Sequence, residues 1–79
     1  MTQLTADVTL DCTGLACPLP ILKLSKAIAG MQPGQIIELI GTDRGSKDDV
    51  PAFCQRTNNT LLASRDEGGR FIFYVKKGL

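Results

Sequence analysis

The fold of this chain is decided by residues 17–29, CPLPILKLSKAIA. A cysteine is followed by two prolines spaced one residue apart, and then by a run whose apolar residues recur at helical intervals. Proline is tolerated in the first turn of a helix, because the N–H that it lacks has no partner there and its fixed φ already suits the turn. Pro18 and Pro20 therefore predict a helix from about residue 18 to residue 29, with Cys17 at or next to its N-cap.

The spacing of the apolar residues predicts which side of this helix is buried. Residues at i, i+1, i+4, i+7 and i+8 share one stripe of a helix surface. We expect the buried stripe to contain Ile21, Leu22, Ser25, Ile28 and Ala29, with Leu24 at its margin and Lys23 and Lys26 on the other side.

A cysteine at the start of a helix is expected to ionise readily. The positive end of the helix dipole and the free backbone N–H groups of the first turn both favour a thiolate over a thiol. Such positions lower the pKa of a cysteine. We therefore expect a lowered pKa for the Cys17 thiol.

The rest of the chain adds four strands and a second helix. Strands are expected over residues 8–11, 35–40, 60–65 and 70–76, with a hairpin turn at 66–69 and a helix from Ser46 or Asp48 to about Thr57. The order βαβαββ predicts an α+β fold, a two-layer α/β sandwich in which two helices lie on one face of a four-stranded mixed sheet. At 79 residues the chain is expected to be a single domain over residues 1–79.

The second helix contains an irregular proline. Pro51 lies past the first turn of a helix capped at Ser46, so we expect a distorted start or a cap near Asp48. Asp49 is interpreted as a capping residue, because no third ligand accompanies Asp43 and Asp49 to form a metal site. Val50, Phe53 and Cys54 are expected to point inward.

Composition excludes several classes of function. A net charge of +1 is not the basic excess of a nucleic-acid binder, and no apolar run approaches the length of about 18 residues that spans a membrane. With three cysteines and no histidine, the chain cannot supply a four-ligand zinc site or a Cys–His catalytic pair. An odd number of cysteines at uneven spacing is also a poor disulfide framework. Since the first residues lack the pattern of a secretory signal, we expect a cytoplasmic location, and nothing in the sequence suggests more than a monomer.

Residues 14–20, GLACPLP, resemble the GLxCPxP signature of the TusA/SirA-like sulfur carriers. The resemblance extends to MQPG at 31–34, DVPAFC at 49–54 and the closing Lys76-Lys77. It implies the βαβαββ sandwich and a sulfane sulfur held as a persulfide on Cys17, with Pro18 and Pro20 shaping the helix start beneath it. Gly14 and Leu19 belong to the same motif as supporting residues.

The resemblance also implies partners and the absence of a resident cofactor. The transient sulfur on Cys17 would come from a rhodanese, a cysteine desulfurase or a DsrE-like protein and would pass to another protein, without direct contact with nucleic acid or membrane. Such a protein acts as a carrier rather than as a stand-alone enzyme. Relatives that serve tRNA thiolation often carry Arg and Glu or Lys where Ala16 and Leu19 stand here. This difference favours sulfur oxidation or sulfur trafficking over 2-thiouridine synthesis.

Other interpretations remain open at this point. Cys12 would be a resolving thiol of a redox module if it formed a disulfide with Cys17, and otherwise a small loop residue; Cys54 is interpreted as a core residue. An RNA-binding module would need a basic face with stacking aromatic residues. Four basic residues would either gather as a partner-docking rim near the thiol or lie on an ordinary exposed face: Lys23, Lys26, Arg44 and Lys47.

Overall fold

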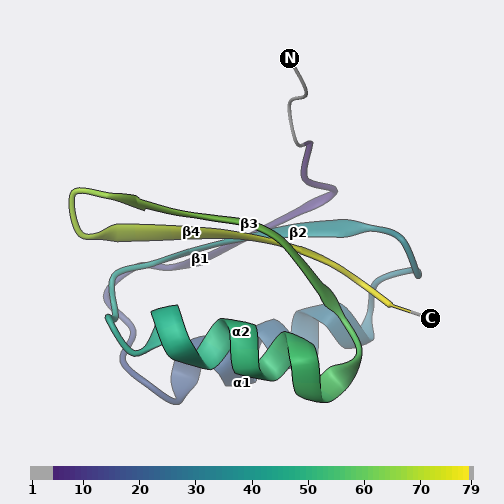
Figure 1. Cartoon of the computed structure of the whole chain (residues 1–79), viewed down its shortest axis with the longest axis horizontal. Helices are drawn as coiled ribbons and strands as arrows, with labels where there is room; N and C mark the ends of the chain where they lie inside the picture. The colour runs from purple at the N-terminus through teal and green to yellow at the C-terminus, as the bar shows by residue number, and fades with distance from the viewer. Residues whose placement is uncertain (1–4, 79) are drawn as a thin grey trace.

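The computed structural model describes residues 5–78. Its elements follow in the order β1 (Val8–Cys12), α1 (Leu19–Ala29), β2 (Ile36–Gly41), α2 (Ser46–Thr57), β3 (Thr60–Glu67) and β4 (Arg70–Lys76). Both helices lie beneath one face of a single sheet, as Figure 1 shows. The predicted two-layer sandwich with a mixed sheet is therefore confirmed.

The sheet brings the ends of β1 and β2 together. Its strand order is β1-β2-β4-β3, in which β1 and β2 are parallel and the other two pairs are antiparallel. A parallel pair needs a crossover connection, and α1 provides it. Because parallel strands run in the same direction, the loops that follow β1 and β2 leave the sheet at the same edge.

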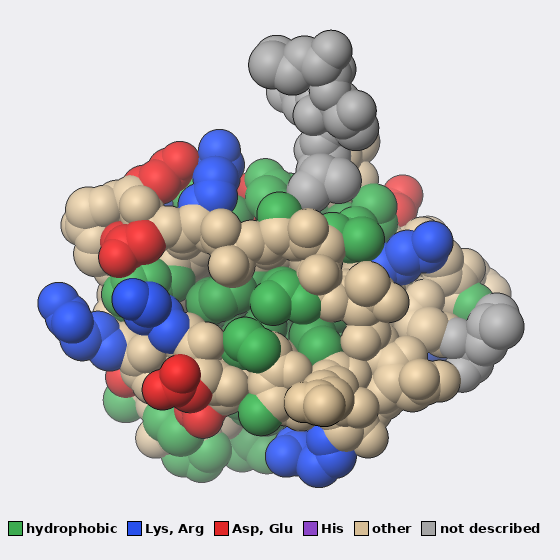
Figure 2. All heavy atoms as spheres, viewed as in Figure 1, with side chains coloured by type: hydrophobic (Ala, Val, Ile, Leu, Met, Phe, Trp, Pro, Cys, Tyr) green, Lys and Arg blue, Asp and Glu red, His purple; other side chains and the backbone are tan. Residues whose placement is uncertain are grey.

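The core lies between the sheet and the helices. Alternation along β2 places Ile37 and Leu39 in the core, and every second residue of β4 does the same. Hydrophobic side chains are visible between the sheet layer and the helix layer in Figure 2. Phe71 and Phe73 are 3% and 2% exposed, so they are packing residues and offer no aromatic platform for stacking RNA bases.

The buried stripe of α1 differs from the prediction. Leu24 is fully buried, whereas Leu22 is 57% exposed and Ser25 and Ala29 are also exposed. Pro20 is buried, so the inward side of the helix starts from this proline and continues at intervals of four through Leu24 and Ile28. The predicted stripe starts at Ile21, one position after the buried Pro20, and is therefore rotated around the helix relative to the observed one.

The start of α2 also differs from the prediction. Gly45 is the N-cap, no side chain caps the helix, and Pro51 lies inside it. A distorted start is confirmed, because the N–H groups of Ser46, Lys47 and Asp48 donate to the carbonyl three residues back, at 3.1 Å each. A cap near Asp48 and a capping role for Asp49 are both wrong, although Val50, Phe53 and Cys54 do point inward.

The β3–β4 hairpin turns more tightly than predicted. Glu67 pairs with Arg70 across a two-residue loop, Gly68-Gly69, in which both φ angles are positive at 64° and 90°. Positive φ at both central residues is the geometry of a type I′ turn, which glycine adopts without steric cost. Asp66 and Glu67 therefore belong to the strand rather than to the turn.

Replacing Leu24 by alanine is expected to destabilise the fold by about 2–5 kcal/mol, because it leaves a cavity at a fully buried position. Leu22→Ala on the exposed side of the same helix is the matched control, and its effect should stay within about 0.5 kcal/mol. Urea unfolding followed by circular dichroism measures both. Equal losses for the two variants would contradict the orientation of α1.

Candidate functional site

Two loops hold Cys17 at the edge of the sheet. Cys17 lies between β1 and α1, directly before the N-cap residue Pro18. Its backbone N–H donates to Oδ2 of Asp43 at 3.2 Å, and the N–H of Gly14 donates to Oγ1 of Thr42 at 2.9 Å. Both acceptors follow β2, so these hydrogen bonds join the loop after β1 to the loop after β2.

The local sequence explains the shape of both loops. Asp11 accepts hydrogen bonds from the Thr13 hydroxyl and backbone N–H, and these hold the pKa of its carboxyl below the ordinary value. Gly14 then takes a φ of +82°, a conformation that side chains disfavour. In the second loop a Cβ on Gly45 would lie 3.0 Å from Oδ2 of Asp43, so glycine there leaves room for this carboxylate.

The surroundings of the Cys17 thiol favour its protonated form. Cys17 is exposed, and its Sγ donates to Oδ2 of Asp49 at 3.1 Å. This hydrogen bond is the main cause that raises the pKa of the Cys17 thiol, followed by loss of some hydrating water and by the negative charges of Asp49 and Asp43. The expectation of a lowered pKa is therefore wrong for the free thiol.

The start of α1 offers less to an anion than its position suggests. The helix begins at Leu19, so Cys17 lies one residue before the N-cap. Pro18 and Pro20 carry no N–H, and the N–H of Leu19 donates to the Ala16 carbonyl at 2.9 Å. The prolines that fix the helix start thus also remove donors that would stabilise a thiolate.

Cys17 opens onto a shallow hollow of about 210 Å³ between the two helices. Its lining consists of Cys17, Pro18, Ile21, Asp49, Ala52 and Arg56. Arg56 is the one basic residue of this lining. Neither Arg56 nor the contact between Asp49 and the thiol was predicted from the sequence. The signal was present, because residues 49, 52 and 56 share one face of a helix by their spacing of three and four.

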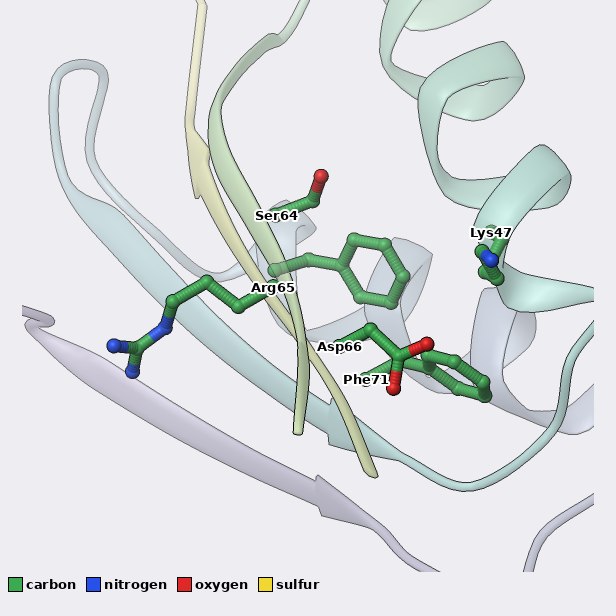
Figure 3. Close-up of a pocket in the computed structure, with 6 residues that line it drawn as sticks. Lys47, Ser64, Arg65, Asp66 and Phe71 are labelled. Carbon is green, nitrogen blue, oxygen red and sulfur yellow. The ribbon is translucent and has the colours of Figure 1, made fainter. Parts of the chain in front are cut away.

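None of the four basic residues considered for partner docking lines this hollow. Lys47 lies elsewhere, with Nζ 5.7 Å from the centre of the Phe71 ring. It borders a second hollow of about 220 Å³ between α2 and the β3–β4 hairpin. Figure 3 shows Lys47 and Asp66 facing this space while Arg65 points away from it. Lys47 therefore borders a different hollow from the one beside the thiol.

The other two cysteines belong to the core. Cys12 is the last residue of β1 and fully buried, and Cys54 is 3% exposed, as predicted for a core residue. Burial raises the pKa of both thiols. All three cysteines are unpaired, and Cys17 is the exposed one. Within residues 5–78 no group of three or more acidic or cysteine side chains is arranged to hold a metal ion.

The fold and the site define a small thiol-presenting protein, in which a sandwich displays one exposed cysteine in front of a proline-started helix. The family model for Sulfurtransferase TusA matches residues 8–77, and the chain belongs to this family.

The similar proteins align with this chain over nearly its whole length. The sulfur carrier protein TusA of Allochromatium vinosum is 48% identical over 71 residues, which cover 90% of this chain and 93% of the relative. The sulfur carrier protein TusA of Pseudomonas entomophila is 36% identical over 77 residues, covering 98% and 96%. A crystal structure of a SirA-like protein from Desulfitobacterium hafniense has a TM-score of 0.79 at 18% identity and covers 91% of this chain and 99% of its own, which shows the shared fold.

Neither helix of the described chain has the length and apolar character needed to cross a membrane.

Asp49→Asn is expected to lower the pKa of the Cys17 thiol, because an amide lacks the negative charge that opposes ionisation. More thiolate would then be present at neutral pH, so alkylation by iodoacetamide at pH 7 should become several-fold faster. The pH dependence of alkylation measures the effect, and Asp48→Asn in the same helical turn is the matched control. An unchanged profile in Asp49→Asn would show that this carboxylate does not control the thiol.

Proposed function

We propose that this protein carries sulfane sulfur as a persulfide on Cys17 and relays it between proteins. The observation that carries the proposal is the exposure of one thiol among three, on a loop fixed by hydrogen bonds and next to a hollow. The names of the relatives support a sulfur-carrier role.

The transfer needs no net oxidation or reduction. The sulfur of Cys17 attacks the outer sulfur of a persulfide on the donor protein, a new S–S bond forms on Cys17, and the S–S bond of the donor breaks. The electron pair of that bond leaves on the donor cysteine, which takes up the proton lost by Cys17. Asp49 is placed to hold this proton during the exchange, because its Oδ2 already accepts the thiol hydrogen at 3.1 Å.

A raised pKa suits a carrier between encounters. The thiolate is the form that oxidants attack, so a thiol kept protonated by Asp49 is protected while the carrier is unloaded. Docking of a donor would then have to shift the thiol proton from Sγ to Asp49 before transfer. This dependence on a partner fits a chain that contains no histidine to act as its own general base.

The surroundings of Cys17 indicate what kind of contact a partner makes. Ala16 and Pro18 are exposed on either side of the thiol, and Leu19 is 46% exposed. We propose that a donor of the rhodanese, cysteine desulfurase or DsrE-like kind and a protein acceptor dock against these apolar groups. Ala16 and Leu19 stand where relatives that serve tRNA thiolation often carry charged residues. We therefore favour sulfur oxidation or general sulfur trafficking over tRNA thiolation.

Two other features bear on the proposal. Three unpaired cysteines are typical of a reducing compartment, and we propose a cytoplasmic location on this ground. The complete burial of Cys12 argues against its use as a resolving thiol for Cys17.

The role is tested by intact-mass spectrometry after incubation with rhodanese and thiosulfate. The parent protein and Cys12→Ala should gain one sulfur atom that a reductant releases, and Cys17→Ser should gain none. Loss of two hydrogens in the parent, dependent on both Cys12 and Cys17, would instead indicate a disulfide-forming redox module.

Leu19→Glu is expected to leave sulfur loading of Cys17 intact and to change delivery, because the side chain is exposed and lies outside the lining of the hollow. Transfer of labelled sulfur from the loaded carrier to several acceptor proteins measures this. Equal delivery by the parent and the variant to every acceptor would count against a role of Leu19 in partner choice.

A further inference from the structure

The α2 side of the hollow beside Cys17 contains one negative and one positive side chain, Asp49 and Arg56. Asp49 lies at the end that accepts the thiol hydrogen, and Arg56 lines the hollow seven residues further along the helix. Seven residues correspond to about 10 Å along a helix axis. Between them stands Ala52, whose small side chain leaves the space open.

Arg56 is free to receive an anion. The one ion pair within residues 5–78 joins Arg65 and Glu67, on β3. Arg56 is exposed and forms no such pair with Asp49, although both line the same hollow. A guanidinium presents several N–H donors in one plane and is well suited to hold an anion.

Several of the other groups around Cys17 are not available to a second sulfur. Pro18 and Pro20 have no N–H, and the N–H groups of Leu19 and Leu22 donate to the carbonyls of Ala16 and Pro18. Asp43 and Asp49 are negative and would repel an anion. Asp43, from the loop after β2, and Asp49, from α2, are the charged groups that act on the free thiol. Arg56, also on α2, is the cation that lines the same hollow.

We propose that Arg56 binds the terminal sulfur of the loaded carrier, in a subsite whose floor is Ala52. This inference rests on the proposed persulfide of Cys17 and adds the group that recognises it. An S–S bond moves the terminal sulfur about 2 Å beyond Sγ. Because the terminal sulfur of a persulfide is an anion, repulsion from Asp49 directs it along the hollow toward Arg56.

In this arrangement the unloaded carrier and the persulfide-loaded carrier differ in the charge that they place in the hollow. The unloaded thiol is neutral and its hydrogen faces Asp49, which leaves Arg56 available to attract the persulfide of a donor. After transfer, the same guanidinium is neutralised by the sulfur that the carrier now holds. Arg56 is thus a specificity-determining residue, and its natural ligand is an anionic sulfane sulfur.

The test compares the persulfide ionisation of the parent, Arg56→Gln and Arg56→Lys. Each protein is loaded with rhodanese and thiosulfate, and the rate at which iodoacetamide alkylates the persulfide is followed by mass spectrometry from acid to neutral pH. Loss of the cation in Arg56→Gln should raise the pH midpoint of alkylation by roughly 0.5–1 unit, because a nearby positive charge favours the anion. Arg56→Lys should restore most of the shift.

Lys47→Gln is the matched control, because it also removes one positive charge from α2 but borders the other hollow. Its midpoint should equal that of the parent. Identical midpoints for the parent and Arg56→Gln, with normal loading, would overturn the subsite and leave the carrier role standing. Failure of the parent to gain sulfur would overturn the carrier role itself.

Discussion

The parallel pairing of β1 and β2 is the constraint on which the site depends. It places the loops after these strands at one edge of the sheet, where Gly14 meets Thr42 and the backbone of Cys17 meets Asp43. Without this pairing the cysteine loop would have no neighbour to fix it. The crossover helix that parallel strands require is also the helix whose start shapes the cysteine, so the topology and the chemistry share one element.

The electrostatics of Cys17 follow from two opposing influences. A helix start attracts negative charge, but here prolines remove part of its N–H donors and two carboxylates approach from the neighbouring loop and helix. For the unloaded thiol the effect of the carboxylates is the larger one, and the pKa of Cys17 is raised. A second sulfur would move the charge away from them, so one set of fixed groups can protect the thiol and still tolerate its loaded form.

The sequence predicted the order of elements and the position of Cys17 at the start of α1 well, because both depend on local patterns. Proline positions located the start of α1 to within a residue, and the hydrophobic pattern located the ends of all four strands to within two residues. Prediction from the sequence failed for the features that depend on contacts between residues far apart in the chain. The raised pKa of Cys17 comes from Asp49, 32 positions away, and the inward side of α1 was set by packing of Pro20 and Leu24 against the sheet.

The burial of two of the three thiols limits the capacity of the molecule. With Cys12 and Cys54 enclosed in the core, a chain in the proposed role transports a single sulfur atom per cycle and has no second cysteine at its surface to store another. The flux of sulfur through such a protein would therefore scale with its abundance and with the frequency of its encounters. A cell that needs more sulfur delivered would have to make more copies of the chain.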